Sequence, residues 1–351
     1  PFLARSTNVF VFGWQAIRDG VRLNRRMHNK AFIADNQLGI TGGRNIGDEY
    51  FDAHAEFAFI DLDVLAAGGV VDAMSRSFDA YWNSDAVVPA AALPVRSSAQ
   101  RRARAGARLG AYAAERARSA YGGEVAAADP LPALLSGRLA WHLAPADLIV
   151  DPPEKALDPA QPSSNLLVGQ LAGLWIAPKA RALIVSPYFV PGPMGMAYFR
   201  YWRHMGVKID VLTIAYAASD VPVVHAGYAN YRVPLLQAGV GLYELKPVGE
   251  PTGGRLRDLA HGSSRASLHA KTFIFDDRHV FVGTFNFDPR SAVLNTEMGI
   301  VNGTENTTDP RLRWSDIYEG VARQSDIEPD TTPLQRALLR TLQALPIEPY
   351  L

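Results

Sequence analysis

The sequence contains no cysteine among its 351 residues, which excludes disulfide bonds, thiolate nucleophiles and zinc sites built on sulfur. It also lacks an excess of either charge, since 35 basic residues balance 35 acidic ones. The balance gives no protein-wide field that attracts nucleic acid, although it still allows a local basic cleft. No apolar stretch reaches the roughly 18 residues needed to span a bilayer. The remaining composition, 48% hydrophobic and 20% charged, is typical of a folded chain of two domains or two fused halves.

An internal repeat is the most informative feature of the sequence. At an offset of 241 residues, the distance from His28 to His269, the chain aligns eight identities over 29 positions without a gap. The repeated residues are His28, Lys30, Phe32, Ile33, Asp35, Gly42, Asn45 and Glu56, which fall on His269, Lys271, Phe273, Ile274, Asp276, Gly283, Asn286 and Glu297. Six of these eight are polar or glycine, whereas packing alone would repeat the apolar positions. The chain is therefore a duplicated unit.

Each copy of the repeat predicts a β-hairpin. In the first copy residues 27–34 predict a strand, Asp35 and Asn36 supply a turn, and a second strand ends at Thr41. The second copy repeats this pattern from residue 268 onward. Because the histidine and the lysine of each copy are two residues apart on the expected strand, they should project from the same face.

The rest of the chain alternates between helix and strand, which favours an α/β fold. We expect helices over 64–81, 99–118, 166–175, 193–204 and 224–237, and strands over 182–185, 207–213 and 240–244. The proline-rich stretch 145–164 predicts a linker between the halves. The expected domains are residues 1–150, which include the first motif (28–45) and connecting helices, and residues 165–351, which include the second motif (269–286).

The two halves are unequal in length before their motifs. About 100 residues of α/β structure precede His269 in its half, whereas only 27 residues precede His28. We therefore expect the first half to lack roughly 75 N-terminal residues and to form an incomplete sheet with an unpaired, apolar edge. The chain also opens with Pro1 and not with methionine, so we interpret it as a fragment whose lost segment is a place for an anchor or signal.

The repeated polar residues suit the chemistry of a phosphodiester. Such a site must neutralise the phosphoryl oxygens, supply a nucleophile and protonate the departing alkoxide. One neutral imidazole can attack phosphorus to form a phosphohistidine, and one imidazolium can protonate the leaving oxygen. Lysines supply fixed charge, amides donate hydrogen bonds, and glutamates accept from the second ring nitrogen of each histidine. The candidate residues are His28, Lys30, Asn45, Glu56, His269, Lys271, Asn286 and Glu297, and this chemistry requires no metal and no cofactor.

The spacing His-x-Lys-x4-Asp-x6-Gly-x2-Asn, present twice, resembles the signature of the phospholipase D superfamily. The resemblance implies two pseudo-symmetric α/β/α sandwich halves packed face to face, here with the first half truncated, and one shared active site. It also implies a supporting role for Asp35 and Asp276 outside the reacting groups. By analogy with related enzymes, His28 is assigned as the nucleophile and His269 as the general acid.

The resemblance extends to a particular branch, the bacterial cardiolipin synthase C-type proteins. It is found at residues 22–30, 42–51, 61–64, 78–82, 186–192, 225–228, 242–247 and 283–290. This implies phosphatidyl transfer from a second phospholipid to phosphatidylglycerol, which yields cardiolipin. It further implies peripheral contact with the cytoplasmic face of a bacterial membrane. The balanced charge argues against a nucleic-acid partner. A phospholipase D-type hydrolase, a nuclease of the same superfamily and a catalytically silent scaffold are the alternatives.

Three further features leave two interpretations open. Tyr188, Asp220, His225 and Tyr228 either line the substrate cleft or support the structure. The arginine-rich helix expected over 99–118 is either a solvated connection or a contact with anionic lipid headgroups. A stripe of leucines near the C-terminus docks either on the bilayer or on the protein's own core; its members are Leu334, Leu338, Leu342 and Leu345.

Overall fold

The computed structural model describes residues 25–51, 53–54, 58–89, 92, 98–157, 165–175, 178–246, 266–303, 328, 331–346 and 348. Contacts divide the chain into two compact units, one of residues 1–13 with 88–144 and the other of residues 14–87 with 145–351. Both sequence motifs lie in the larger unit. None of the helices in the described part of the chain is long and apolar enough to cross a bilayer.

The smaller unit contributes three helices, α4 (Ala99–Ala117), α5 (Ala120–Ala127) and α6 (Leu131–Leu135). The hydroxyls of Ser98 and Ser119 accept hydrogen bonds from backbone N–H groups in the first turns of α4 and α5, which is the usual way to begin a helix. Every residue of α4 is exposed. The expected arginine-rich helix is therefore present, and its contact with lipid stays a prediction.

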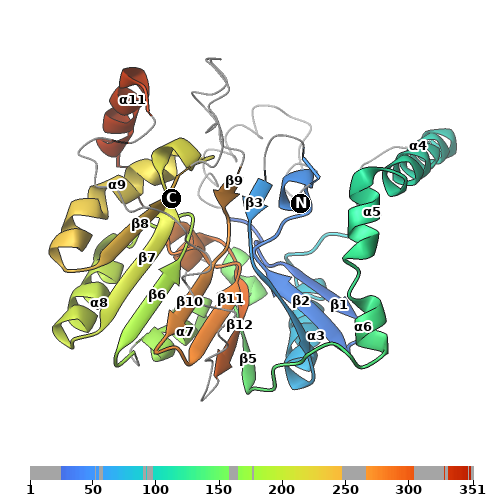
Figure 1. Cartoon of the computed structure of the whole chain (residues 1–351), viewed down its shortest axis with the longest axis horizontal. Coiled ribbons are helices and arrows are strands. Elements are labelled where there is room, and N and C mark those ends of the chain that lie inside the picture. The colour runs from blue at the N-terminus through green and yellow to red at the C-terminus, as the bar shows by residue number, and fades with distance from the viewer. Residues whose placement is uncertain are drawn as a thin grey trace. The chain divides into compact units, whose positions relative to one another are not determined.

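A seven-stranded mixed sheet dominates the larger unit, in the order β5-β12-β11-β10-β6-β7-β8 (Figure 1). Strands β6, β7 and β8 are parallel to one another, and the other neighbours pair antiparallel. The strands are β5 (Ala146–Val150), β6 (Arg181–Val185), β7 (Lys208–Ile214), β8 (Gly241–Leu245), β10 (Thr272–Phe275), β11 (His279–Gly283) and β12 (Met298–Gly303). Helices alternate with these strands, so the predicted α/β class is confirmed.

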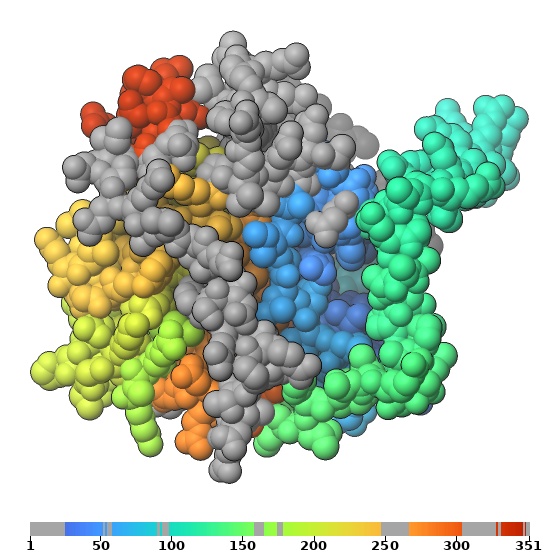
Figure 2. Space-filling model, in the orientation of Figure 1, coloured from blue at the N-terminus to red at the C-terminus, as the bar shows by residue number. Residues whose placement is uncertain are grey.

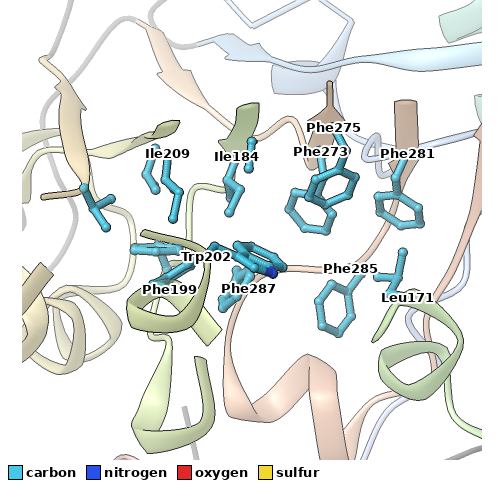
Figure 3. Packing of buried hydrophobic residues seen from close by; sticks show 14 of the residues in the cluster. Leu171, Ile184, Phe199, Trp202, Ile209, Phe273, Phe275, Phe281, Phe285 and Phe287 are labelled. Carbon is cyan, nitrogen blue, oxygen red and sulfur yellow. The ribbon is translucent and has the colours of Figure 1, made fainter. Parts of the chain in front are cut away.

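Helices α7 (Leu167–Trp175) and α8 (Gly192–His204) cover one face of this sheet. Figure 3 shows Phe273 and Phe281 of the sheet turned toward Leu171 of α7 and Trp202 of α8. All four side chains are almost fully buried. Burial of aromatic and aliphatic area on this scale is the main stabilising contribution to the second half.

The C-terminal helix packs on the protein itself, mainly through a leucine that is not in the expected stripe. Helix α11 (Pro333–Gln343) packs on α9 (Pro222–Gln237), and Leu339 is buried against Tyr216 and Ala226 while Leu342 is partly buried beside it (Figure 1). Tyr216 belongs to the 3-10 turn η6 (Tyr216–Ala218), which precedes α9 in the sequence. Three of the four leucines of the expected stripe are exposed, namely Leu334, Leu338 and Leu345. Only Leu342 of that stripe lies on the face of α11 that packs against the protein.

The first half contains a sheet of only three described strands, β1 (Ala31–Ala34), β2 (Leu38–Gly42) and β4 (Asp63–Ala67), in the order β1-β2-β4. One face packs on α3 (Gly69–Trp82), whose Val71 and Met74 meet Ile300 of the larger sheet. The edge strand β1 exposes Phe32. A short first sheet with an exposed apolar edge strand was predicted, and the described residues form one.

Two predicted segments differ from the structure. The helix expected over 64–81 begins only at Gly69, because residues 63–67 pair with β2 and Gly68 turns the chain at φ 84°. Tertiary pairing thus overrides the helix preference of leucine and alanine here. The linker expected over 145–164 contains β5 and the 3-10 turn η4 (Pro153–Ala156), because its apolar start pairs with β12 before the prolines begin.

Candidate active site

The two hairpins that contain the motifs have the same turn. Asp35 and Asn36 both adopt positive φ, at 52° and 54°, and so do Asp276 and Asp277, at 55° and 56°. Two successive residues of this kind form the turn whose twist matches paired antiparallel strands. A Cβ on Gly283 would lie 2.3 Å from the carbonyl oxygen of Met298, so only glycine allows the neighbouring strand to approach this closely.

The strands are interrupted at the histidines, contrary to the prediction of one continuous strand from 268 to 275. Strand β9 (Ala266–Leu268) ends before His269, and β10 begins after Lys271. The reason is a change of partner: the N–H groups of His269 and Ala270 both donate to the carbonyl of Ile60, at 2.8 and 3.1 Å. Ile60 belongs to β3 (Ala58–Ile60), which runs parallel to β9 and joins the two halves (Figure 1).

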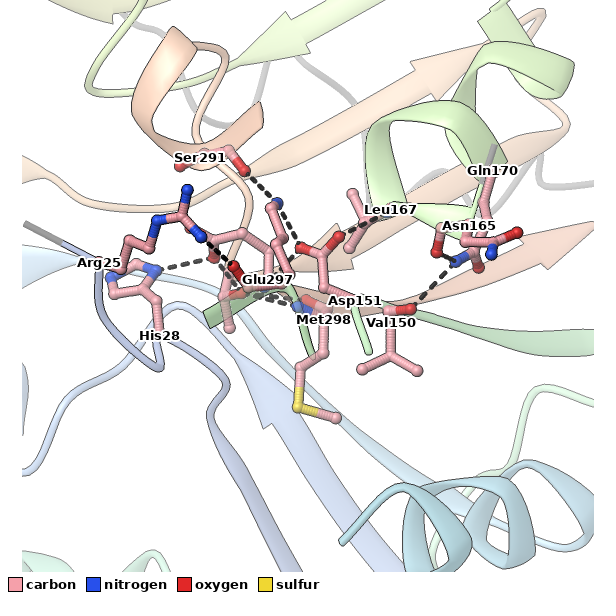
Figure 4. Close-up of polar contacts among 12 residues, drawn as sticks. Arg25, His28, Val150, Asp151, Asn165, Leu167, Gln170, Ser291, Glu297 and Met298 are labelled. Atoms are coloured by element: carbon pink, nitrogen blue, oxygen red, sulfur yellow. Dashed lines mark hydrogen bonds and ion pairs between the residues drawn. The ribbon is translucent and has the colours of Figure 1, made fainter. Parts of the chain in front are cut away.

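Each histidine is held by a carboxylate from the opposite half. His28 Nδ1 lies 2.8 Å from Glu297 Oε2 (Figure 4), and His269 Nδ1 lies 2.7 Å from Asp61 Oδ2. Both carboxylate side chains are fully buried. The blue residues of the first half and the orange and yellow residues of the second lie side by side in Figure 2, as the pairing of β3 with β9 requires. Because each histidine contacts a carboxylate of the opposite half, these crossed contacts bring the two motifs together.

Asp61 occupies the position that corresponds to Glu297. In one half, Met27 precedes His28 and pairs with Thr296, the residue before Glu297. In the other half, Leu268 precedes His269 and pairs with Ile60, the residue before Asp61. The sequence register had assigned Glu56 instead, and Glu56 lies outside the described residues. Strand pairing explains the discrepancy: the first sheet pairs positions 42 and 63, but the second pairs 283 and 299, so the first connection is five residues longer.

The two lysines occupy equivalent places beside their histidines. Lys30 Nζ donates to the carbonyl oxygen of His28 at 2.9 Å, and Lys271 Nζ donates to that of His269. Lys271 Nζ also lies 3.0 Å from His269 Nδ1. Lys271 is 1% exposed, so its ammonium is almost completely removed from water.

The lysine and histidine charges of both halves act on one another. Burial lowers the pKa of Lys271 to about 7, partly offset by Asp61, and Lys30 lowers it further. Burial lowers the pKa of Lys30 to about 8, although Glu297 and Asp61 act in the opposite direction. Burial, reinforced by Lys271 and Lys30, lowers the pKa of His269 to about 4. Burial is thus the largest cause of all three shifts, and a nearby anion would favour the charged forms of these groups.

The two motif asparagines have different surroundings. Asn45 Nδ2 donates to the hydroxyl of Tyr50 at 2.7 Å, and the Tyr50 ring meets the His269 ring edge-on at 5.0 Å between centroids. Tyr50 closes the short turn η2 (Asp48–Tyr50). Asn286 is buried, and among the described residues its side-chain oxygen has no hydrogen-bond partner. It precedes the π-helical turn η8 (Arg290–Leu294).

The motif aspartates lie at the turns and not at the histidines. Asp276 accepts hydrogen bonds from the N–H groups of Lys179, Ala180 and Arg181, at 2.7 to 2.9 Å. These bonds lower the pKa of Asp276 against the effect of its burial, and they fix the entry into β6. Asp35 occupies the same turn position in the first hairpin.

The expected cleft residues fall into two groups. The Tyr188 hydroxyl lies 2.9 and 2.8 Å from the two carboxylate oxygens of Asp220, and the charge of Asp220 raises the pKa of Lys271. His225 is buried, with Nε2 3.4 Å from Glu328. Nearby, the Tyr228 hydroxyl donates to Glu244. The Arg232 guanidinium lies 2.8 Å from Glu244 and 2.7 Å from Glu328, so it connects the two carboxylates. Tyr188 is therefore linked to the site through Asp220. His225 and Tyr228 instead contact the carboxylates of Glu328 and Glu244.

Sequence reasoning missed the role of Asp61 and that of Thr284. The Thr284 hydroxyl donates to Glu297 Oε2, the same oxygen that meets His28. Asp61 was within a segment typical of the cardiolipin synthase branch, but only the pairing of β3 with β9 reveals its contact. The resemblance at residues 61–64 therefore included Asp61, but it did not indicate what this residue does.

Comparisons with known proteins identify the family of the chain. Residues 177–310 match the family described as "Cardiolipin synthase, PLD-like domain". The chain is 38% identical over 359 residues to cardiolipin synthase C of Escherichia coli (strain K12), which covers 95% of this chain and 74% of that protein. It is 25% identical over 291 residues to cardiolipin synthase A of Pseudomonas putida, covering 82% of this chain and 46% of that protein.

A solved structure supports the fold. The crystal structure of phosphatidylserine synthase from Haemophilus influenzae Rd KW20 superposes with a TM-score of 0.53 at 14% identity, over 82% of this chain and 60% of that chain. Identity this low shows similarity of fold alone. The relative from Escherichia coli, with its higher identity and coverage, confirms the resemblance drawn from the motifs. This chain belongs to the cardiolipin synthase branch of the phospholipase D superfamily.

Proposed function

We propose that this chain moves a phosphatidyl group from one phospholipid to the free glycerol hydroxyl of phosphatidylglycerol, which yields cardiolipin and releases a small alcohol. The observation that supports this most is the pair of histidines, each held by a carboxylate of the opposite half. The buried Lys271 and the half-buried Lys30 act on the same site. Membership of the cardiolipin synthase branch identifies the class of substrate.

In the first step His28 attacks the phosphorus atom. Its Nδ1–H donates to Glu297, so the lone pair of Nε2 is free to form the phosphorus–nitrogen bond. The bond from phosphorus to the departing alcohol breaks, and His269 protonates the leaving oxygen. Burial, together with the charges of Lys271 and Lys30, lowers the pKa of His269 to about 4. An arriving phosphate offsets the charges of Lys30 and Lys271 and thereby raises that pKa.

In the second step the acceptor hydroxyl replaces the histidine. Neutral His269 takes the proton of the glycerol hydroxyl, and its oxygen attacks phosphorus while the phosphorus–nitrogen bond breaks. His28 is thereby regenerated. The low pKa of His269 favours the neutral form that this step requires. The two lysines and the side-chain amides of Asn45 and Asn286 stabilise the charge on the phosphoryl oxygens.

We also infer that the chain acts as a peripheral protein at the cytoplasmic face of the bacterial membrane. Its proposed substrates, phosphatidylglycerol and a second phospholipid, reside in the bilayer, so the site must meet them at the surface. The nearly neutral overall charge argues mildly against a nucleic-acid substrate.

Product analysis tests the proposal. The purified chain is incubated with vesicles of phosphatidylglycerol, with and without phosphatidylethanolamine, and lipids are identified by mass spectrometry. Cardiolipin is the expected product. His28→Asn and His269→Asn should each lower turnover by at least about 10³-fold, because each histidine forms or breaks a bond. His204→Asn, at an exposed position that ends α8, is the matched control and should retain activity.

Other products would identify the alternatives. Phosphatidic acid without cardiolipin indicates a hydrolase that uses water as the acceptor. Cleavage of an oligonucleotide without any change in the lipids indicates a nuclease. Turnover that survives either histidine substitution contradicts a single site shared by the two motifs.

A further inference from the structure

A buried ion pair lies next to Glu297 and takes no part in the steps above. Lys155 Nζ is 2.8 Å from Asp151 Oδ2, and the two side chains are 2% and 0% exposed. Replacing a buried pair of charges by apolar residues of similar volume is often neutral or stabilising. Stability alone therefore gives little reason to keep this pair, and its contacts point to another role.

Asp151 fixes the backbone of Glu297 from both sides. The N–H of Asp151 donates to the carbonyl of Glu297 at 2.9 Å, and Asp151 Oδ2 accepts from the N–H of Glu297 at 2.8 Å (Figure 4). The Glu297 side chain then extends to the ring of His28. Displacing Asp151 would therefore displace the carboxylate that orients this histidine.

Lys155 connects three more parts of the site. Its ammonium donates to the carbonyl of Ser291 at 2.9 Å, in the turn η8 that follows Asn286. Its own carbonyl accepts from Arg25 Nη1 at 3.0 Å, three residues before His28. The charge of Glu297 also acts on the Lys155 ammonium. The segment before His28, Glu297 and the turn beyond Asn286 thus meet at one ion pair.

We propose that Asp151 and Lys155 are positioning residues that hold Glu297 so that Nδ1 of His28 keeps the proton and Nε2 faces phosphorus. Glu297 is fully buried, and within the described ranges its Oε1 has no hydrogen-bond partner. The Lys155 ammonium and the Glu297 carboxylate act on each other through their opposite charges. The catalytic meaning of this arrangement rests on the proposed function, but the tautomer of His28 can be measured without any substrate.

Nitrogen NMR of histidine-labelled protein tests the proposal. The His28 signals are assigned by their loss in His28→Asn. Wild type should show Nδ1 protonated and Nε2 unprotonated, whereas Lys155→Met and Asp151→Asn should show a mixture of tautomers. With lipid vesicles, kcat should fall on the order of tenfold to hundredfold at a nearly unchanged KM. The His269 signals should stay at their wild-type positions.

Two further variants separate positioning from folding. The double variant Asp151→Asn with Lys155→Met restores charge balance, so it should fold while His28 remains a mixture of tautomers. Asp210→Asn is the matched control, because Asp210 is 5% exposed and its carboxylate lies 3.3 Å from the Lys208 ammonium on β7. It should lower the unfolding midpoint and leave the His28 tautomer unchanged.

The outcomes are distinguishable from failure of the proposed function. A folded double variant with the wild-type tautomer and wild-type kcat overturns the positioning role. A tautomer change in Asp210→Asn equal to that in Lys155→Met overturns it as well. If wild type does not transfer lipid, the proposed function fails, but the tautomer comparison still tests the positions of Glu297 and His28.

Discussion

Asp61 accepts from His269 at 2.7 Å, just as Glu297 accepts from His28. An amide at position 61 would keep the size of the side chain, but it would stabilise the imidazolium less and allow the wrong tautomer. We therefore expect Asp61→Asn to lower turnover on the order of 10²- to 10⁴-fold in the vesicle assay. Glu56→Gln is the matched change and should alter turnover by no more than about twofold. Equal losses in both variants would contradict the assignment from strand pairing.

Lys271 predicts opposite effects of pH on stability and on binding. Its folded pKa of about 7 is below its unfolded value, so between these values the unfolded chain binds more protons. The free energy of unfolding of the empty protein should therefore rise with pH above about 7. Binding of glycerophosphoglycerol, whose charge is constant in this range, should weaken there by up to about tenfold per pH unit as the ammonium is lost.

The change Lys271→Met isolates this contribution. The unfolding midpoint of the variant, measured by calorimetry, should lose the part of the rise with pH that Lys271 contributes. Its dissociation constant for glycerophosphoglycerol, measured by titration calorimetry, should be higher than that of wild type at pH 6 and depend less on pH. A variant that keeps the wild-type pH dependence of both quantities would show that Lys271 does not titrate in this range.

At the level of helices and strands, local patterns predicted most of the elements. The hairpin turns at Asp35 and Asp276, the strand β6 and the helices α4, α7 and α9 all follow from alternation, turn residues and helical spacing. Pairing between distant segments was not predictable in the same way. The break after Leu268, the strand β5 and the contact of Asp61 depend on partners far away in the sequence. The histidine–lysine motifs and the carboxylate of Glu297 were therefore visible in the sequence, whereas Asp61 and the crossing of the carboxylates between the halves were not.

The two hairpins also differ in what their aspartates hold. Asp276 accepts three N–H groups at the entry to β6, which pairs with β10. In the first half the described residues supply β1 with only one neighbour, β2. Asp276 thus also holds the strand beside its hairpin. The feature that both motif aspartates share is the positive φ in the hairpin turn, which accounts for their repetition outside the histidine pair.

For the molecule as a whole, equivalent apolar rows have different surroundings. Phe32, Ile40 and Leu65 form a cross-strand row of the first sheet. The corresponding row of the second sheet is Phe273, Phe281 and Val301. The second row is buried beneath α7 and α8, and Phe273 is 0% exposed. Phe32 is 68% exposed, so the duplicated sequence gives a core position in one half and a surface position in the other.

This difference predicts unequal costs for the same substitution. Phe273→Ala should lower the free energy of unfolding by about 3–5 kcal/mol, because it leaves a cavity among packed side chains. Phe32→Ala should lower it by less than about 1 kcal/mol, since an exposed side chain leaves no cavity. Denaturant unfolding measures both values, and binding of a hydrophobic dye should decrease in Phe32→Ala because the exposed apolar area is smaller. If Phe32→Ala destabilises the protein as much as Phe273→Ala does, then the first sheet is covered in solution and the two rows are equivalent after all.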